Sequence, residues 1–491
     1  MVELTSTALL LAIFGFLIAA SVLSGRTLER LGVPVVLLFL LLGILAGSEG
    51  LGGVSFDDYG FAFRVGTAAL VLILLDGGLN TSVASVKESF KPAAILATFG
   101  VAGTAGLVAL FARFMGLPWT ESMLLGAVVS STDAAVVFAV LRGGGLRLHR
   151  RIATTIELES GINDPMAVIL TLAVTTVVAG EQVDRTDLIT GVPLQLAIGL
   201  AAGVGFGYAA RWLLRRVRLS TAGFYPVLIM GGAFLCYGVT TLIGGSGFLA
   251  VYAAAVVIGN SRIPLQSGLA RVLDAIAWLS QITMFLMFGL LVFPSQLMSV
   301  AWVGIAIALF MAFVARPLVV TLCLLPFRYP AKEVAYVGWV GLKGAVPIIL
   351  AIFPVLAGVQ GAMNVFNIVF FIVVCSAIVP GATLRWVTRR LGLQAPDVPS
   401  PVAALEINST RLLNGELLSF FITEPLAVCN VPVSKIPFPP HCSAVLLVRG
   451  EELIAPRGST VLRPGDHVYV FCRAEDKPFI QLIFGRPEEH T

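Results

Sequence analysis

About thirteen apolar segments, most of them close to 20 residues long, follow one another along the first four-fifths of this 491-residue chain. A helix needs about 20 apolar residues to cross the hydrocarbon core of a membrane. Charged residues make up only 12% of the sequence, against about 25% in soluble proteins. The pattern therefore predicts an all-α polytopic membrane protein. The predicted transmembrane helices cover residues 5–24, 31–48, 64–80, 90–114, 118–141, 151–179, 190–214, 223–243, 246–260, 272–292, 297–325, 334–356 and 364–386.

Basic residues are distributed unequally between alternate loops. With the N-terminus outside, nineteen Lys and Arg residues fall on the cytoplasmic side and three, Arg64, Arg113 and Arg185, on the external side. Cytoplasmic loops carry an excess of Lys and Arg, so this orientation is favoured, and an odd number of helices places the C-terminus in the cytoplasm. The first segment lacks the basic start of a signal peptide, which predicts a retained helix.

Cysteine and histidine residues give no sign of a metal site. The six cysteines are scattered without metal-type spacing, and the four histidines all lie outside the apolar segments. We expect reduced cysteines without a disulfide framework and no histidine-based metal site or proton relay within the membrane. The sequence predicts no bound cofactor in this region and no nucleic-acid partner.

The composition changes after Arg390. We predict a transmembrane domain over residues 1–390, a Pro-rich linker over 391–404 and a small α+β cytosolic domain over 405–491. Short apolar, β-branched runs and a Pro-Gly turn indicate strands, and about 85 residues can fold independently. The predicted elements are strands at 443–448 and 467–471, a turn at 463–466 and a closing helix at 477–484.

Polar breaks interrupt neighbouring apolar segments. The run Ser130-Ser131-Thr132-Asp133 lies in the fifth segment, and Glu159-Ser160-Gly161-Ile162-Asn163-Asp164-Pro165 lies in the sixth. Ionisable groups at membrane depth are costly and mark ion or proton pathways. A third break, Gly341 to Pro347, lies in the twelfth segment. Paired breaks in corresponding helices of two halves indicate a transporter site. We therefore predict inverted repeats of six helices, with 190–214 as the linker and two unwound helices that cross.

Asp164 is the leading candidate for ion binding. A low-dielectric environment favours the neutral form of a carboxyl group, so Asp164 can hold a proton or a monovalent cation but not both. Ser160 lies one helical turn earlier on the same face. We expect Ser160 and Thr132 to supply further oxygens to the cation, and Asn163 to bridge towards Asp133 without adding charge. The alternative for Ser160 is a hydrogen bond within its own helix.

Asp133 is expected to neutralise the ends of broken helices, and its role can exchange with that of Thr132. The alternative is a purely structural helix cap. Glu159 and Lys343 are predicted to form a buried ion pair, because each alone would be costly.

Three further charged residues have accessory or structural predictions. Glu157 is predicted to reach an aqueous funnel, and Asp76 either assists the site through water or caps a helix. Arg316 is expected to extend to the cytoplasmic interface.

These motifs resemble the monovalent cation–proton antiporters of the NhaP/NHE type. The Thr-Asp break at 132–133, the Glu-Ser-x-x-Asn-Asp run at 159–164 and the Gly-Leu-Lys-Gly-Ala-Val run at 341–346 match that family in order and spacing. The resemblance implies that Asp164 binds the ion and exchanges the proton, with ligands from Thr132 and Ser160. It also implies electroneutral exchange, a homodimer and elevator-like alternating access.

Two details refine the resemblance. The Asn-Asp-Pro-Met version is similar to the bacterial cell-volume-regulation potassium–proton antiporters, which implies the bacterial cytoplasmic membrane. Residues 455–466 resemble the TrkA-C domain of potassium-conductance regulators, which implies paired tails that bind a small, nucleotide-like ligand. Lys343 and Asp76 depart from the family, where arginine and glutamate are usual, and a lysine loses its proton more readily than an arginine.

Several functions remain open from the sequence. The first is exchange of cytoplasmic K⁺ for external H⁺, with Na⁺ as the alternative cation. A regulated cation channel would explain the tail, but the chain lacks a Thr-Val-Gly-Tyr-Gly filter. An intramembrane hydrolase using Asp76 and Asp133 would be an enzyme, but no companion catalytic motif accompanies them. The antiporter explains more of the motifs than either alternative.

Overall fold

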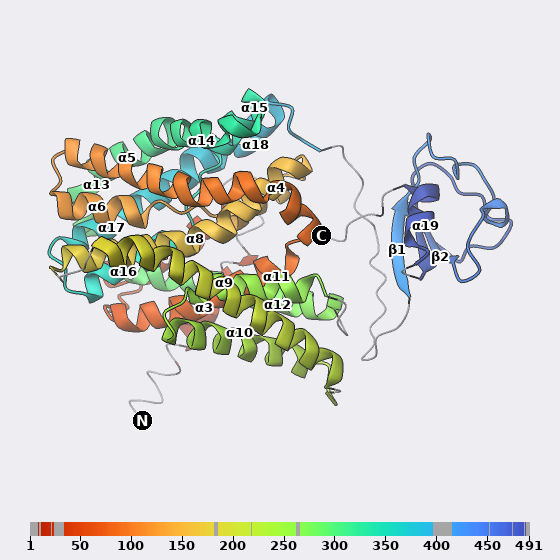
Figure 1. Ribbon diagram of the computed structural model, residues 1–491, viewed down its shortest axis with the longest axis horizontal. Helices are drawn as coiled ribbons and strands as arrows, with labels where there is room; N and C mark the ends of the chain where they lie inside the picture. The colour runs from red at the N-terminus through yellow and green to blue at the C-terminus, as the bar shows by residue number, and fades with distance from the viewer. Residues whose placement is uncertain are drawn as a thin grey trace. The chain divides into compact units, whose positions relative to one another are not determined.

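The computed structural model describes residues 8, 11–20, 22–23, 34–180, 185–217, 219–261, 266–395, 415–450, 452–473, 475–485 and 487. These residues separate into two compact units, one of helices and one that contains a small sheet (Figure 1). Parts of several predictions lie outside the described residues: the ends of the first helix, the start of the second, most of the 391–404 linker and the start of the tail domain.

Helices occupy every range that the hydropathy pattern predicts. Eight of them are long and apolar enough to cross a membrane within the described part of the chain, and shorter apolar helices, including Leu11–Ala20, accompany them. The helices are α2 (Val35–Ala46), α3 (Tyr59–Asn80), α4 (Val83–Ile95), α5 (Val101–Phe114), α6 (Trp119–Val128), α7 (Ala134–Arg142), α8 (Arg150–Val178), α9 (Arg185–Arg216), α10 (Phe224–Leu242), α11 (Gly247–Gly259), α12 (Gln266–Leu290), α13 (Pro294–Phe310), α14 (Arg316–Leu324), α15 (Ala331–Trp339), α16 (Val346–Leu356), α17 (Ala362–Ser376) and α18 (Ala382–Arg390).

Short π-helical segments join several of these helices into longer spans. They are η1 (Leu96–Gly100), η2 (Met311–Ala315) and η4 (Ala377–Gly381). Each adds backbone length to a turn and shifts the face that the following helix presents. Such segments often lie next to functional residues, and η2 directly precedes Arg316.

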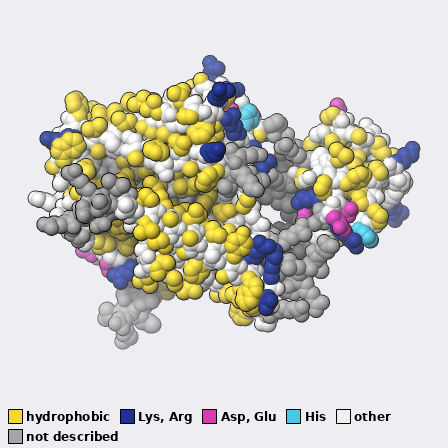
Figure 2. Space-filling view, viewed as in Figure 1, with side chains coloured by type: hydrophobic (Ala, Val, Ile, Leu, Met, Phe, Trp, Pro, Cys, Tyr) yellow, Lys and Arg dark blue, Asp and Glu magenta, His cyan; other side chains and the backbone are white. Residues whose placement is uncertain are grey.

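The surface of the helical unit is largely apolar. Figure 2 shows hydrophobic side chains over most of its visible face. Large exposed side chains include Trp302 on α13, Phe313 in η2 and Leu322 on α14. Contiguous exposed apolar surface of this kind is typical of contact with lipid. Together with the helix lengths, it identifies a multi-pass membrane protein.

Helix α8 runs through the middle of the packing and carries the longest polar run. It packs against α4, α6, α11 and α16 (Figure 1). Its side chains from Glu159 to Asp164 therefore face several other helices at once. The structure places them beside the interruptions between α6 and α7 and between α15 and α16.

The C-terminal unit is a four-stranded antiparallel sheet with one helix. The strand order is β1-β4-β2-β3, and buried apolar residues such as Phe420, Leu447 and Ile480 form its core. The predicted strands, turn and closing helix are confirmed. The elements are β1 (Glu416–Phe421), β2 (Ser443–Arg449), β3 (Glu452–Ile454), β4 (Asp466–Cys472) and α19 (Lys477–Phe484).

Candidate functional site

The two helix interruptions contact each other. The first break, residues 129–133, separates α6 from α7, and the second break, residues 340–345, separates α15 from α16. The backbone N–H of Asp133 donates to the carbonyl oxygen of Leu342 at 2.8 Å. This bond satisfies two backbone groups that a continuous helix would have paired internally. The two non-helical segments are thus held together by main-chain atoms.

Asp133 caps α7. Its Oδ1 accepts from the Val136 N–H at 3.2 Å, as expected of an aspartate at a helix N-terminus. A Cβ at Gly344 would lie 1.8 Å from Asp133 Oδ2, so glycine alone lets the second break approach this carboxylate. The helix-capping interpretation of Asp133 describes these contacts, and it is compatible with neutralising the positive end of α7.

Hydrogen bonds from α8 hold the first break in place. Ser160 Oγ donates to the Thr132 carbonyl oxygen at 2.9 Å and accepts from the Ala134 N–H at 3.1 Å. Asn163 Nδ2 donates to Thr132 Oγ1 at 2.6 Å. The alternative of a Ser160 bond within its own helix is therefore wrong. The amide of Asn163 binds Thr132, which corrects the expectation that it bridges towards Asp133.

Asp164 lies at the centre of this arrangement and is 7% exposed. Asp133 and Lys343 are the charged groups that act on its carboxylate, and the Ser131 side chain also interacts with it. One of these neighbours carries a like charge and the other an opposite charge. Small shifts in their positions therefore change whether the Asp164 carboxylate is charged or neutral. This is the environment expected of a group that exchanges a proton for a cation.

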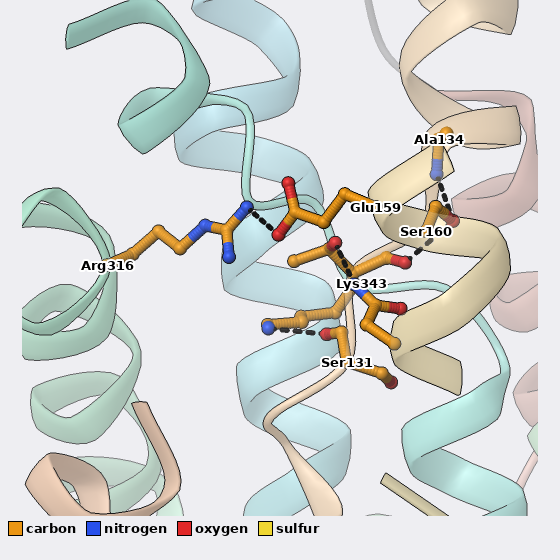
Figure 3. A network of polar contacts seen from close by, with 8 residues as sticks. Ser131, Ala134, Glu159, Ser160, Arg316 and Lys343 are labelled. Atoms are coloured by element: carbon orange, nitrogen blue, oxygen red, sulfur yellow. Dashed lines mark hydrogen bonds and ion pairs between the residues drawn. The ribbon is translucent and has the colours of Figure 1, made fainter. Parts of the chain in front are cut away.

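The ion pair of Glu159 differs from the prediction. Arg316 Nη2 donates to Glu159 Oε1 at 2.5 Å, and both side chains are almost fully buried (Figure 3). Lys343 Nζ instead donates to the Ser131 carbonyl oxygen at 2.5 Å. The predicted direct Glu159–Lys343 pair is wrong, and so is the placement of Arg316 at the interface. Lys343 remains within electrostatic range of Glu159 and Asp164.

The position of Arg316 in the fold is compatible with its pairing with Glu159 in place of Lys343. Its helix begins immediately after the π-helical η2, and its guanidinium is buried against Glu159. Gly341 leaves room for the arginine stem, because a Cβ there would lie 3.2 Å from Arg316 Cγ. The sequence carried a signal for this role: Arg316 is the only charged residue in the predicted span 297–325, and lone charges at membrane depth usually have a buried partner.

Lys343 is held at two points. Besides the bond from Nζ, its backbone N–H donates to Ser376 Oγ at 3.1 Å, and Ser376 Oγ donates to the Val373 carbonyl oxygen. The side chain is 2% exposed. These contacts fix the position of the ammonium group relative to the first break. Ser131 and Ser376 were not among the residues singled out from the sequence, and serine spacing alone does not indicate them.

Glu157 belongs to a separate polar cluster. Thr81 Oγ1 donates to Glu157 Oε1 at 2.9 Å and lies 3.2 Å from Tyr252 Oη. The ring of Tyr252 packs against Gly161, where a Cβ would lie 2.4 Å from the ring carbon Cζ. Glu157 is half-buried on the side of α8 that faces α3 and α11. Glu157 therefore lies on a different face of α8 from Glu159, which pairs with Arg316 of α14.

Asp76 lies within α3, four residues before its end, so the helix-capping alternative for Asp76 is wrong. Asn80 Nδ2 contacts its carboxylate at 3.3 Å, and Asp274 and Arg142 act on it electrostatically. Asp274, on α12, is an acidic neighbour that the sequence did not indicate. Within the described residues, neither Asp76 nor Glu157 is hydrogen-bonded to the helix breaks.

The donor set suits a monovalent cation better than a resident metal. Among the described residues, no three His, Cys, Asp or Glu side chains converge as metal ligands. Helix α8 and the first break instead offer two carboxylates, Asp164 and the helix-capping Asp133, together with hydroxyl and amide oxygens. Hard monovalent cations bind oxygen ligands of this kind.

Comparison with known proteins agrees with this arrangement. The transmembrane part of the sodium/hydrogen exchangers matches residues 13–390, and a TrkA-C domain matches residues 417–477. The K(+)/H(+) antiporter NhaP of Alkalimonas amylolytica is 40% identical over 97% of this chain and 83% of that protein. The K(+)/H(+) antiporter NhaP2 of Shewanella oneidensis is 38% identical over 96% of this chain and 83% of that protein.

The fold is also shared with a solved structure. The sodium proton antiporter MjNhaP1 from Methanocaldococcus jannaschii superposes with a TM-score of 0.63 at 22% identity, over 76% of this chain and 99% of that chain. Since the family match covers most of the sequence and the relatives align along nearly its whole length, the chain belongs to the sodium/hydrogen exchanger family and carries a C-terminal TrkA-C domain.

Proposed function

We propose that this protein is a secondary antiporter that exchanges cytoplasmic K⁺ for external H⁺. The observation that carries the proposal is the buried carboxylate of Asp164 beside two broken helices that contact each other. Relatives along nearly the full length are named K(+)/H(+) antiporters, which favours K⁺ over Na⁺. The Na⁺/H⁺ alternative is supported by the name of the structural relative, a sodium proton antiporter.

Competition at one carboxylate is sufficient for coupling. Asp164 holds either a proton or a cation, so loading of K⁺ from the cytoplasm releases a proton, and a proton from outside displaces K⁺. Ser160 and Thr132 provide further oxygens to the cation through the lone pairs that their hydrogen bonds leave free. Each form of the site carries the same net charge, because one proton or one K⁺ neutralises one carboxylate. Exchange is therefore one-for-one and electroneutral.

The charged groups around Asp164 do not need to change their protonation during one-for-one exchange. Glu159 and Arg316 neutralise each other in a buried pair, so neither needs to take up or release a proton during the cycle. Asn163 contributes an amide beside Asp164 and no second titrating group. Asp133 stabilises the N-terminus of α7. Asp76 and Glu157 are assigned to the cytoplasmic approach, where acidic groups concentrate cations.

The same proposal includes the architecture around the site. Thirteen transmembrane helices form six-helix inverted repeats, and the two interrupted helices cross at the site. The protein works as a homodimer in a lipid bilayer, the bacterial cytoplasmic membrane, with its N-terminus outside and its C-terminus in the cytoplasm. Access alternates by an elevator-like movement. The TrkA-C domains pair with each other, bind a small nucleotide-like ligand and regulate exchange.

Proteoliposomes test the function directly. Purified protein is reconstituted, a pH gradient is imposed, and lumenal pH is recorded as K⁺, Na⁺ or Li⁺ is added, with and without thiocyanate to collapse the membrane potential. A K⁺-driven pH change that is indifferent to thiocyanate is expected, and Asp164→Asn abolishes it. A pH change with Na⁺ alone would make Na⁺ the exchanged cation in place of K⁺. Cation flux without proton movement would mean that the protein is a channel.

A further inference from the structure

Two buried oxygen atoms, one in the first break and one on α8 next to Asp164 in the sequence, have no hydrogen-bond partner. Among the described residues, Ser131 Oγ and Asn163 Oδ1 are buried polar atoms that complete no hydrogen bond. Their residues are 1% and 0% exposed. Unpartnered buried oxygens cost free energy, and each one in a native structure calls for a physical reason. A bound cation supplies one, since it takes hydroxyl and amide oxygens as ligands.

The oxygens named from the sequence are already engaged. Ser160 Oγ makes two hydrogen bonds to the backbone of the first break, and Thr132 Oγ1 accepts from Asn163 Nδ2. A hydroxyl group offers one donor and two acceptor sites, so Ser160 retains a single lone pair. Ser131 Oγ, by contrast, completes no hydrogen bond and acts on the Asp164 carboxylate, so its lone pairs remain available to a cation beside that carboxylate.

The position of Ser131 is fixed from the opposite side. Lys343 Nζ donates to its carbonyl oxygen (Figure 3), while the Ser131 side chain interacts with the Asp164 carboxylate. The backbone of this residue is thus held by the second break. A ligand held in this way is preorganised, and little ordering remains to be done when the ion arrives.

We propose that the Ser131 hydroxyl is a direct cation ligand, together with Asn163 Oδ1 and the Asp164 carboxylate, and that it sets the preference among monovalent cations. The inference rests on the proposed antiporter function. It adds a ligand that the family resemblance does not supply. K⁺ is larger than Na⁺ and takes more oxygen ligands, so a site that has lost one oxygen can still complete the shell of Na⁺ but leaves that of K⁺ incomplete.

The adjacent serine provides a matched control. Ser130 is equally buried, but its Oγ donates at 2.7 Å to the carbonyl oxygen of Ala127, in the last turn of α6. Ser130→Ala therefore removes a hydroxyl from the same break without removing one that is free to bind an ion. Ser131→Cys provides a second test, because it keeps the shape of the side chain and replaces the hard oxygen with soft sulfur.

The experiment measures half-saturating K⁺ and Na⁺ concentrations and maximal rates in proteoliposomes, with melting temperatures in detergent. Ser131→Ala and Ser131→Cys are expected to raise half-saturating K⁺ about tenfold, to raise half-saturating Na⁺ less, and to leave the maximal rate within about twofold. Ser130→Ala is expected to resemble the wild type in both concentrations.

The outcomes separate the two proposals. If the wild type exchanges K⁺ for H⁺ but both Ser131 variants keep its half-saturating concentrations, the ligand assignment is overturned and the antiporter remains. The assignment is also overturned if Ser130→Ala raises the half-saturating K⁺ and Na⁺ concentrations as much as the Ser131 variants do. The effect would then belong to the first break as a whole. If the wild type shows no proton-coupled flux, the proposed function itself fails. When Ser131→Ala lowers the melting temperature strongly, Ser131→Cys decides.

Discussion

Arg316 and Glu159 form a buried ion pair, with Arg316 Nη2 2.5 Å from Glu159 Oε1. The pair joins α14 to α8 and lies beside the second helix break. Taking two charges out of water is costly, and only close pairing offsets that cost. The pair therefore ties the position of α8 to the helices on its other side.

Removing one partner leaves the other charge buried and alone. We expect Glu159→Gln to destabilise the protein by about 3–5 kcal/mol, the usual cost of breaking a buried pair. Glu333→Gln is the control, because Glu333 Oε2 lies 3.9 Å from the half-exposed Arg151, a distance too long for a hydrogen bond, so its loss should destabilise the protein less. Melting curves in detergent compare the two. Equal melting temperatures would show that Arg316 has another partner.

Gly344 can carry no side chain. A Cβ would lie 1.8 Å from Asp133 Oδ2, so Gly344→Ala is expected to force the two breaks apart, abolish exchange and cost about 1–3 kcal/mol by overpacking. Gly341→Ala is the matched variant in the same break, since its nearest contact is the flexible stem of Arg316 at 3.2 Å. Proton-coupled flux measures both. Activity retained in Gly344→Ala would contradict the close approach.

The sheet domain contains its own buried ion pair. Asp466 is 1% exposed and accepts from Arg449 Nε and Nη2, each at 2.8 Å, and from the Arg463 N–H at 2.7 Å. Asp466→Asn should destabilise this domain by about 1–3 kcal/mol, because it weakens three hydrogen bonds while Arg449, whose side chain is 29% exposed, can still reach water. Limited proteolysis of the full chain reports the loss as faster cleavage within residues 415–485.

An exposed pair in the same domain gives the control for this change. Glu475 lies 3.5 Å from Arg473 and is 70% exposed at its side chain, so Glu475→Gln should change cleavage little. Cleavage of Asp466→Asn at the wild-type rate would mean that the Arg449 pair contributes nothing to the domain.

Alkaline pH should loosen the sheet domain through Cys472. Burial raises the pKa of its thiol to about 11, above the ordinary value near 9 that it recovers on unfolding. The unfolded domain therefore releases this proton first, so the stabilisation is complete below about pH 9 and is lost as the pH rises through about 11. Proteolysis at pH 8 and pH 10 measures the loss. Cys472→Ala should show a shallower pH dependence, and an unchanged one would rule out this thiol as the cause.

Much of the fold follows from the sequence alone. Apolar length located the helices because a membrane span needs a fixed number of residues, and the 467–471 strand followed from β-branched and aromatic residues after a Pro-Gly turn. The polar runs at 130–133 and 159–165 located the site, since ionisable groups rarely occur among apolar residues without a function.

Partner choice could not be predicted in the same way. The sequence predicted Lys343 as the partner of Glu159 and placed Arg316 at the interface, whereas Arg316 follows the π-helical η2 and pairs with Glu159. Such a turn has no compositional sign in Met311–Ala315. The hydrogen bond from Asn163 to Thr132 was also hidden, because it depends on the path of a non-helical segment and not on a periodic pattern.

The bonds that Ser160 makes to the first break, and the main-chain bond from Asp133 to Leu342, have a mechanical consequence. Helix α8 and both interruptions are coupled by short, directional contacts and form one stiff assembly. Thermal motion of any one member is then transmitted to the other two. A mutation that frees the main-chain contact between Asp133 and Leu342 should therefore loosen all three members, and a mutation of Ser160 should also weaken binding of the ion for which Ser160 is a proposed ligand.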